Sequence, residues 1–422
     1  MRRVALFAVL ASACGTYRFQ HGPEDQDELV TCPPCALPEV CDESRHVCST
    51  ATLTWEELGG SATGSGVSGT GAQDVAVAVT AEGNPVVAWS AGDEIFASRW
   101  TGAAWEQLGS GVSLSAAVSE EPAIAIDGVG RVLVAWTEGS DMAKDIYLRR
   151  WDGSAWQELD GSAQGAGISG IGLTSMQPQL AVTPSDEPVV AWLEDTGPTA
   201  WEIYARRFDG ADWREYDGSA QGDGLSKASV TAWNPSLAVR DSGNPCVAWS
   251  AGDTTVDMRL RCWNGTTWLA LGPSADPGGI SPTTSHAFNS SLAIDGLGRA
   301  WVSWRGNAEG RWEAYLRYFE NGAWRELAGS AQVSGDIAAS DHVKLAMSSS
   351  DRPVVAWLQD TGVGRTVAMR FWTGDEWVDL AEPGNEISAV GSIDVMKVAV
   401  ASGGSVIATW IDGARVYLKR LR

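Results

Sequence analysis

Carboxylates and ring-bearing side chains in the segments between the β-rich runs are the residues of this sequence that could do chemistry. Two carboxylates can act as acid and base on a glycosidic bond, and several together can hold hydroxyls or a calcium ion. The acids in these segments are Asp93, Glu94, Glu138, Asp141, Asp145, Glu194, Asp195, Asp253, Glu309, Asp360 and Asp412. The rings, which are the candidate ligand-binding residues, are Trp201, Trp233, His286, Trp312 and His342.

Catalysis is less well supported by the sequence than binding. The four histidines, His21, His46, His286 and His342, do not have the spacing of a Ser/His/Asp or Cys/His arrangement. The acids are so numerous that no pair stands out as the two carboxylates of a glycoside hydrolase. The sequence therefore predicts no catalytic residue, no metal ligand and no cofactor, and leaves calcium as an open alternative.

The elements that must position these residues repeat along the chain. Residues 122–159 contain four short β-rich runs separated by Gly/Asp turns, which is typical of an antiparallel meander. Both faces of the second run are apolar, as a sheet between two neighbours requires. Its tryptophan recurs at Trp89, Trp136, Trp192, Trp249, Trp304, Trp357 and Trp410. We therefore expect one blade for each of these tryptophans, with the indole rings in the core.

The two ends of the repeat are complementary. Residues 52–58 match a fourth run but precede any first run, whereas the last unit starts at Val395 and ends after a third run. An N-terminal strand that completes the last sheet closes a ring, and a ring hides the edges of its sheets. The sequence therefore predicts an all-β fold over residues 51–422, a seven-bladed β-propeller of four-stranded antiparallel blades closed by its N-terminal strand.

The loops are expected to differ between the two faces of the ring. Turns between first and second runs, such as 127–130, and between third and fourth runs, such as 152–155, are tight. The other face, which we call the long-loop face, receives the second-to-third turns and the connections between blades, such as 160–177. Because binding residues favour long loops on a rigid scaffold, the site is expected on the long-loop face.

The N-terminal residues predict export. Arg2 and Arg3 precede an apolar run, which is the pattern of a signal peptide over residues 1–13. Residues 10–14, Leu-Ala-Ser-Ala-Cys, resemble a lipobox, in which the cysteine, here Cys14, is acylated. An ordinary cleavage site within 11–13 is the alternative. We expect an exported bacterial lipoprotein, at the outer membrane or cell surface, that meets the membrane only through its lipid.

The cysteine count agrees with lipidation. An odd number in an exported protein leaves one cysteine unpaired, and the chain has seven. Residues 14–50 read as a lipid-tether linker with a disulfide-stapled, cysteine-rich segment, for which a zinc site or a redox Cys-x-x-Cys is the alternative. The cysteines of this segment, whose pairing the sequence leaves open, are Cys32, Cys35, Cys41 and Cys48. Cys246 and Cys262 fall on the second and third runs of the fourth blade, where we predict a cross-strand disulfide.

The net charge limits the partners. It is −23 at pH 7, so the surface repels nucleic acid and anionic lipid head groups and leaves cations or neutral sugars as easier partners. Beyond the N-terminus no run of about 18 apolar residues could span a membrane. A glycan or an envelope protein is the expected partner, nucleic acid is not, and the protein is expected to be a monomer.

Two recurring motifs carry a resemblance to known propellers. They are Asp-Gly-Ser-Ala-Trp-Gln-Glu-Leu at 152–159 and Gly-x-Pro-x-Val-Ala-Trp at 83–89. With them, residues 52–422 resemble bacterial secreted propellers built from sialidase-type or tectonin and fucose-lectin-type repeats. The second motif lies between first and second runs, whereas the sialidase Asp-box follows the third. The sialidase arginine cluster, nucleophile tyrosine and acid do not map onto this chain, so the resemblance implies the fold and no hydrolase site.

These observations predict a surface-tethered lipoprotein whose propeller is a non-enzymatic binding module for glycans or proteins. The first alternative is a cell-envelope glycoside hydrolase or lyase that uses carboxylates of the long-loop face. The second is a structural scaffold of an envelope complex. Propellers host all of these functions, so the fold alone does not choose between them.

Overall fold

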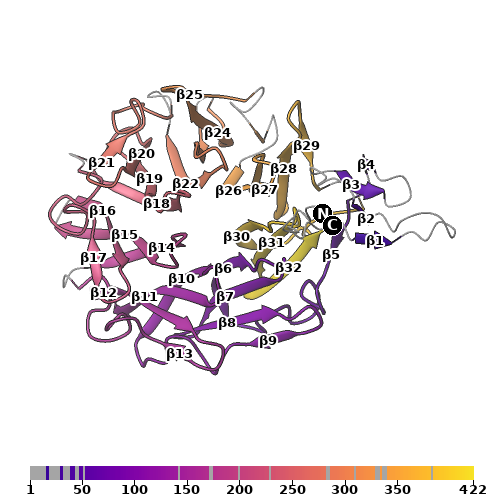
Figure 1. Ribbon diagram of the computed structural model, residues 1–422, viewed down its shortest axis with the longest axis horizontal. Helices are drawn as coiled ribbons and strands as arrows, with labels where there is room; N and C mark the ends of the chain where they lie inside the picture. Colours follow the sequence, from indigo (N-terminus) through magenta and orange to yellow (C-terminus); the bar gives the residue numbers. More distant parts are fainter. Residues whose placement is uncertain are drawn as a thin grey trace, which may run out of the picture.

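The computed structural model of the chain is an all-β ring (Figure 1). It describes residues 53–140, 143–170, 174–197, 200–227, 230–281, 286–307, 310–327, 333–334, 340–381 and 384–422. Four further strands are described nearer the N-terminus: β1 (Thr16–Arg18), β2 (Leu29–Thr31), β3 (Glu39–Asp42) and β4 (Val47–Thr50). Within these ranges the structure contains no helix with the length and hydropathy needed to cross a membrane.

Seven sheets of four antiparallel strands form the ring, and we number them as blades 1 to 7 in chain order. The first, innermost strands are β6 (Ala72–Val79), β10 (Val118–Ile126), β14 (Ser175–Val182), β18 (Ala232–Val239), β22 (Ala287–Ile294), β26 (Ser340–Met347) and β30 (Ile393–Val400). The second strands are β7 (Pro85–Ala91), β11 (Val132–Ser140), β15 (Pro188–Gly197), β19 (Pro245–Ala251), β23 (Ala300–Gly306), β27 (Pro353–Asp360) and β31 (Val406–Asp412).

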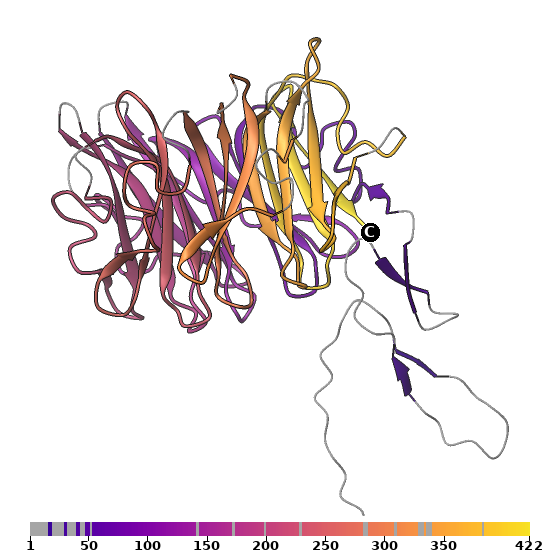
Figure 2. The same cartoon turned by 90° about the horizontal axis from the view of Figure 1, so that it is seen from above.

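The outer half of each blade follows in the same order. The third strands are β8 (Glu94–Trp100), β12 (Ala143–Trp151), β16 (Ala200–Phe208), β20 (Asp257–Trp263), β24 (Glu313–Glu320), β28 (Arg365–Trp372) and β32 (Arg415–Leu421). The outermost strands are β9 (Trp105–Gln107), β13 (Trp156–Gln157), β17 (Trp213–Glu215), β21 (Trp268–Ala270), β25 (Ala323–Arg325), β29 (Trp377–Asp379) and, from the N-terminal side, β5 (Trp55–Glu56). Figure 2 shows the ring edge-on, with strands that cross from one face to the other.

The ring is closed by the N-terminal strand, as predicted. β5 pairs with β32 and completes blade 7, which has the order β30-β31-β32-β5. The amide of Thr54 donates to the carbonyl of Arg422 at 2.9 Å, and the indole Nε1 of Trp55 donates to the Leu380 carbonyl in blade 6 at 2.6 Å. Because these bonds join the two ends of the propeller, opening the ring would expose both a sheet edge and a buried tryptophan.

The blades pack through the second-strand tryptophans, which are all buried, as predicted. In five blades the indole meets a ring of the third strand, as in the stacked pair Trp136–Tyr147 with ring centroids 5.9 Å apart. Blade-to-blade contact is therefore made by the largest apolar side chains of the repeat, which remove roughly 150–250 Å² each from water.

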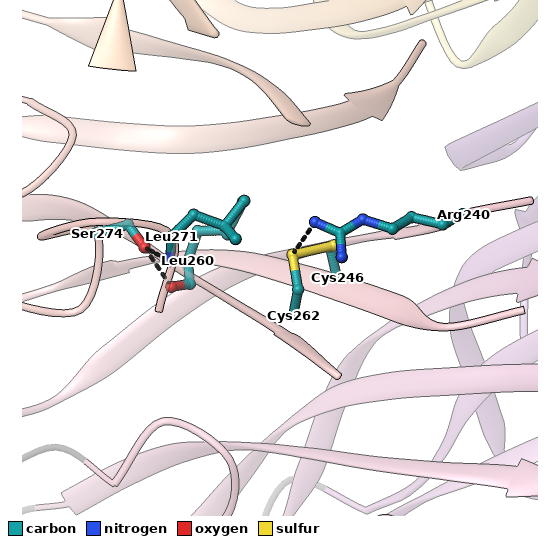
Figure 3. The surroundings of a disulfide bond; sticks show 6 residues. All are labelled: Arg240, Cys246, Leu260, Cys262, Leu271 and Ser274. Atoms are coloured by element: carbon teal, nitrogen blue, oxygen red, sulfur yellow. Dashed lines mark hydrogen bonds between the residues drawn. A yellow bond between two sulfur atoms is a disulfide. The ribbon is translucent and has the colours of Figure 1, made fainter. Parts of the chain in front are cut away.

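The predicted disulfide is present in blade 4. Cys246 on β19 lies opposite Cys262 on β20, and the two sulfur atoms are 2.09 Å apart (Figure 3). Arg240 Nη2 lies 3.3 Å from the Cys262 sulfur. In the N-terminal segment Cys41 on β3 lies opposite Cys48 on β4. Cys14, Cys32 and Cys35, and the side chains of the other two, lie outside the described residues, so lipidation and these pairings stay predictions.

Candidate active site

The five predicted ligand-binding residues are spread over four blades. Trp201 is half-buried on β16, where it lies opposite Asp195 and packs against the core between blades 3 and 4. Trp233 and His342 were expected just before first strands, but they lie within β18 and β26. His342 has a φ of 49°, because each innermost strand is bulged near the long-loop face and this residue sits at the bulge of blade 6.

Only His286 and Trp312 come together, and they do so through Phe288 in blade 5. The ring of Phe288 stacks on His286 and tilts against Trp312, with centroids 6.0 Å apart in both pairs. The Arg305 guanidinium lies over Trp312, 4.2 Å from its centroid. One face of this tryptophan is therefore taken by a cation–π contact, which leaves less of the ring for a sugar.

Four of the eleven predicted acids support loops. Asp253, Asp360 and Asp412 accept backbone N–H groups of Thr231, Gly362 and Ser392 at 3.3, 2.8 and 3.0 Å. Asp195 accepts the N–H of Gly197 at 2.9 Å. Asp141 and Glu309 lie outside the described residues. Among the described residues no group of three His, Cys, Asp or Glu side chains could hold a metal ion.

The remaining acids can be compared between blades at two repeated positions, which lie at the long-loop ends of strands 2 and 3. In each blade the residue two positions after the second-strand tryptophan lies directly opposite one of the first three residues of strand 3. We call these two residues the strand-end pair. The pairs of blades 1 to 7 are Ala91–Glu94, Glu138–Asp145, Glu194–Glu202, Ala251–Asp257, Gly306–Glu313, Gln359–Thr366 and Asp412–Arg415. Both members are acidic in blades 2 and 3 and in no other blade.

The blade 2 pair has side chains that reach the surface. Glu138 and Asp145 are half-buried, and directly opposite residues have Cβ atoms about 4.5–5.5 Å apart. Glu138 Oε2 accepts the indole N–H of Trp136 at 2.9 Å and the hydroxyl of Ser119 at 3.0 Å. Asp145 Oδ1 accepts the Ser169 hydroxyl at 2.8 Å, while burial raises the pKa of Asp145. Two carboxylates are thus held in fixed positions with unequal surroundings.

The blade 3 pair is buried instead. Glu194 Oε2 accepts the hydroxyl of Ser175 at 2.6 Å and the indole N–H of Trp192 at 2.7 Å, and its Oε1 has no hydrogen-bond partner. Burial, with smaller contributions from the charges of Asp145 and Asp195, raises the pKa of Glu194 to about 7. Glu202, which accepts the Ser226 hydroxyl, is buried opposite it. Both side chains of the blade 3 pair are therefore shielded from solvent, unlike those of the blade 2 pair.

Serines in the connections between blades position the third strands, and the sequence interpretation missed them. In every blade an apolar residue followed by serine closes the connection, and the serine hydroxyl accepts a strand-3 backbone N–H, as Ser169 does from Ile146 at 3.0 Å. The seven serines are Ser68, Ser113, Ser169, Ser226, Ser281, Ser334 and Ser388. The signal was readable as an apolar-Ser dipeptide once in each repeat.

Comparisons with known proteins bear on the fold. No protein-family model matches the chain, and no curated protein matches it. Among solved structures, an ulvan lyase, which is a polysaccharide lyase, aligns at a TM-score of 0.55 and 10% identity over 88% of this chain and 94% of its own. The α-L-arabinanase of Penicillium chrysogenum aligns at 0.46 and 12% over 88% and 98%. A Hadza microbial sialidase aligns at 0.47 and 11% over 80% and 72%.

These comparisons correct the predicted function. The likeness to the ulvan lyase shows the propeller fold, which agrees with the resemblance to sialidase-type propellers. The prediction of a non-enzymatic binding module is corrected, because the ulvan lyase, which aligns over most of both chains, is an enzyme. The alternative prediction, an enzyme that uses carboxylates of the long-loop face, takes its place.

Proposed function

We propose that this protein is a glycan-cleaving enzyme, a glycoside hydrolase whose reacting groups are Glu138 and Asp145 on the long-loop face. The observation that carries the proposal is their register: the two carboxylates lie directly opposite each other on β11 and β12, half-exposed, at the end of a rigid sheet. Retaining glycosidases hold their two carboxyl groups about 5–5.5 Å apart. The spacing of a cross-strand pair is compatible with that distance.

The surroundings of the two carboxylates suggest their roles. Asp145, whose pKa burial raises, is suited to donate a proton to the glycosidic oxygen as the bond to the leaving sugar breaks. Glu138, oriented by Trp136 and Ser119, is suited to attack the anomeric carbon and form a glycosyl ester. Water, deprotonated by Asp145, then releases the sugar and restores both groups.

Charge favours hydrolysis of a neutral glycan over elimination from an anionic one. Lyases act on uronates, whose carboxylate must be neutralised by a cation or donor before a base removes the neighbouring proton. The strand-end pairs of blades 2 and 3 consist of acids, and the net charge is −23. Neutral polysaccharides are therefore the substrates that this face repels least.

A screen of the full chain against neutral and uronate-containing polysaccharides tests the proposal. Release of reducing ends without an unsaturated, ultraviolet-absorbing product would identify hydrolysis, whereas the unsaturated product would identify a lyase and overturn the preference for hydrolysis. Glu138→Gln and Asp145→Asn are each expected to lower the rate by on the order of 10²–10⁴-fold while circular dichroism stays unchanged.

The matched control is Glu94→Gln in blade 1. Glu94 occupies the same strand-end position as Asp145, but its partner is Ala91 and its Oε1 accepts the backbone N–H groups of Ile95 and Ser113 at 2.9 and 2.7 Å. An amide oxygen can take over those bonds, so activity is expected to persist. Full activity in both blade 2 variants would rule out this site.

We also propose that the chain is exported as a monomeric lipoprotein acylated at Cys14. The support is the apolar run that ends in Leu-Ala-Ser-Ala-Cys and the cysteine count of seven. Mass spectrometry of the protein from its native membrane is expected to find a lipid-modified cysteine as the first residue. An unmodified N-terminus would contradict the proposal.

A further inference from the structure

A cavity of about 470 Å³ lies between blades 2 and 3, at the face that carries the tight turns. Its walls include the turns that follow β10 and β14, the end of β12 and the residues after β13. Ligand pockets commonly have about 300–1,000 Å³, so the space is large enough for a sugar unit. This face is opposite the proposed active site, so the cavity belongs to neither strand-end pair.

The tight-turn ends of strands 2 and 3 carry different side chains in blade 2 and in blade 5. In blade 5, Trp301 and Tyr318 stack with centroids 4.4 Å apart, and the Arg299 guanidinium covers both rings at 5.5 and 5.4 Å. The cross-strand partners in blade 2 are Leu133 and Arg150. An aliphatic and a charged side chain therefore stand where blade 5 has two aromatic rings, and the charged one, Arg150, lines the cavity.

Arg150 is the unsatisfied group of this cavity. Its Nε is buried and has no hydrogen-bond partner. The residue opposite it on β13 is Gln157, whereas at the same position Arg99 faces Glu106 at 2.8 Å in blade 1 and Arg420 faces Glu56 at 2.6 Å in blade 7. Blade 2 therefore repeats the arginine of blades 1 and 7 without repeating its carboxylate.

A second arginine faces the same space. Arg131 also lines the cavity, and burial together with the charge of Arg131 lowers the pKa of Arg150. Arg131 Nε donates to the buried Asp127 at 2.6 Å, which fixes its guanidinium. The charges of Asp127 and Asp152 also act on Arg150, but its buried Nε has no hydrogen-bond partner, so the two guanidinium groups can bind a carboxylate through paired hydrogen bonds.

Five acids line the cavity, and four of them, all but Asp160, already have donors. Asp186 Oδ1 accepts the N–H of Gly128 at 2.6 Å, and Asp209 accepts two turn amides and Arg214. Glu187 lies 3.7 Å from Arg207, and Glu158 accepts the amide of Gln164 at 2.6 Å. Carboxylates with remaining lone pairs are acceptors for hydroxyl groups, so they suit the neutral, hydroxyl-rich body of a ligand whose anionic end meets the arginines.

We propose that this cavity binds a sugar unit that carries one carboxylate, with its carboxylate on Arg131 and Arg150 and its hydroxyls on the surrounding acids. The ligand class is a uronate-type sugar acid. A bare oxyanion gains only the arginine contacts, and the surrounding acids repel it. A neutral sugar leaves Arg150 unpaired. The site is independent of the proposed hydrolase, because it lies at the other end of the strands.

Calorimetric titration of the full chain with glucuronate tests the proposal. Glucose serves as a probe for the hydroxyl-rich body of the ligand, and inorganic sulfate as a probe for its anionic group. Glucuronate is expected to bind saturably and at least tenfold more tightly than either. Arg150→Gln and Arg150→Tyr, the latter restoring the blade 5 residue, are each expected to weaken binding at least tenfold. The matched control Arg99→Gln in blade 1 is expected to leave binding unchanged.

Several outcomes would overturn the site. They are the absence of saturable glucuronate binding, equal binding by either Arg150 variant in its folded state, and sulfate or glucose binding as tightly as glucuronate. The Glu138→Gln variant separates this inference from the proposed function. It is expected to lose turnover and keep glucuronate binding, and loss of both in a folded variant would contradict the independence of the two sites.

Discussion

Blades 2 and 3 and blades 5 and 6 are two versions of the same pair of neighbours. In both, an arginine after the first turn donates to the aspartate that opens it, Arg131 to Asp127 and Arg299 to Asp295, at 2.6 Å each. In both, an aspartate of the next blade accepts a turn glycine amide at 2.6 Å, Asp186 from Gly128 and Asp351 from Gly296. The backbone frame is therefore shared down to individual hydrogen bonds.

The two neighbour pairs differ at a few side chains on each face. At the tight-turn face, blade 5 has Trp301 and Tyr318 where blade 2 has Leu133 and Arg150, and Arg150 lines the cavity. At the long-loop face, blade 3 has the ionisable Glu194 where blade 6 has Gln359, which accepts the Trp357 indole N–H at 2.9 Å. The comparison shows that the backbone frame depends on the repeated positions, whereas the shape and charge of each face vary with single side chains within that frame.

Trp301→Leu gives blade 5 the residue of blade 2 and is expected to have the largest effect. The change removes the stack on Tyr318 and the indole N–H bond to Asp295, 2.8 Å long. The free energy of unfolding should fall by about 3 kcal/mol. Denaturant unfolding monitored by circular dichroism measures it, and a loss under about 1 kcal/mol would show that the rings do not hold this interface.

Glu194→Gln gives blade 3 the residue type of blade 6. The fold raises the pKa of Glu194 to about 7 from 4.5, so the folded chain keeps a proton that the unfolded chain releases. The wild-type stability should therefore decrease as pH rises from about 4.5 to 7, and the variant should lose that part of the decrease, on the order of 2 kcal/mol. Equal pH profiles of the two proteins would contradict the buried acid.

Asp295→Asn and Asp127→Asn compare the two turns directly. Both aspartates are buried and bound by an arginine, but Asp295 also accepts the Trp301 indole. Asp127→Asn leaves Arg131 poorly paired, with an expected loss of about 1–2 kcal/mol. Asp295→Asn weakens the bonds to both Arg299, which keeps Glu320 at 2.7 Å, and the Trp301 indole, so we expect a larger loss. Thermal unfolding of the two variants measures the order, and the reverse order would contradict the added role of the indole.

The double variant Leu133→Trp/Arg150→Tyr gives blade 2 the rings of blade 5 and should have the smallest effect. Filling the cavity should raise the free energy of unfolding by about 1 kcal/mol. The neighbouring residues of blade 3 differ from those of blade 6, which limits the gain. Unfolding of the variant below the wild-type midpoint would show that the surroundings of blade 2 have no room for the rings.

The active-site prediction fell short of the fold prediction for a physical reason. The acids Glu138 and Asp145 were both named among the candidate carboxylates, yet they were two of many. Their pairing depends on the register of β11 and β12, which the turn between these strands sets. The length of this turn differs from blade to blade. The candidate rings were chosen as exceptions to the repeat, and exceptions carry no information about which blade neighbours they meet.

The sequence by itself determined the ring: seven repeats of alternating apolar runs, the orphan strand around Trp55 that completes blade 7, and the Cys246–Cys262 pair. Periodic burial and local turns encode these features, so they can be read along the chain. Only the tertiary structure decided that Arg150 lacks a partner and that Glu138 faces Asp145 while Glu194 is buried. Those properties depend on what lies across a strand or in the next blade, and such distances through space are not set by distance along the sequence.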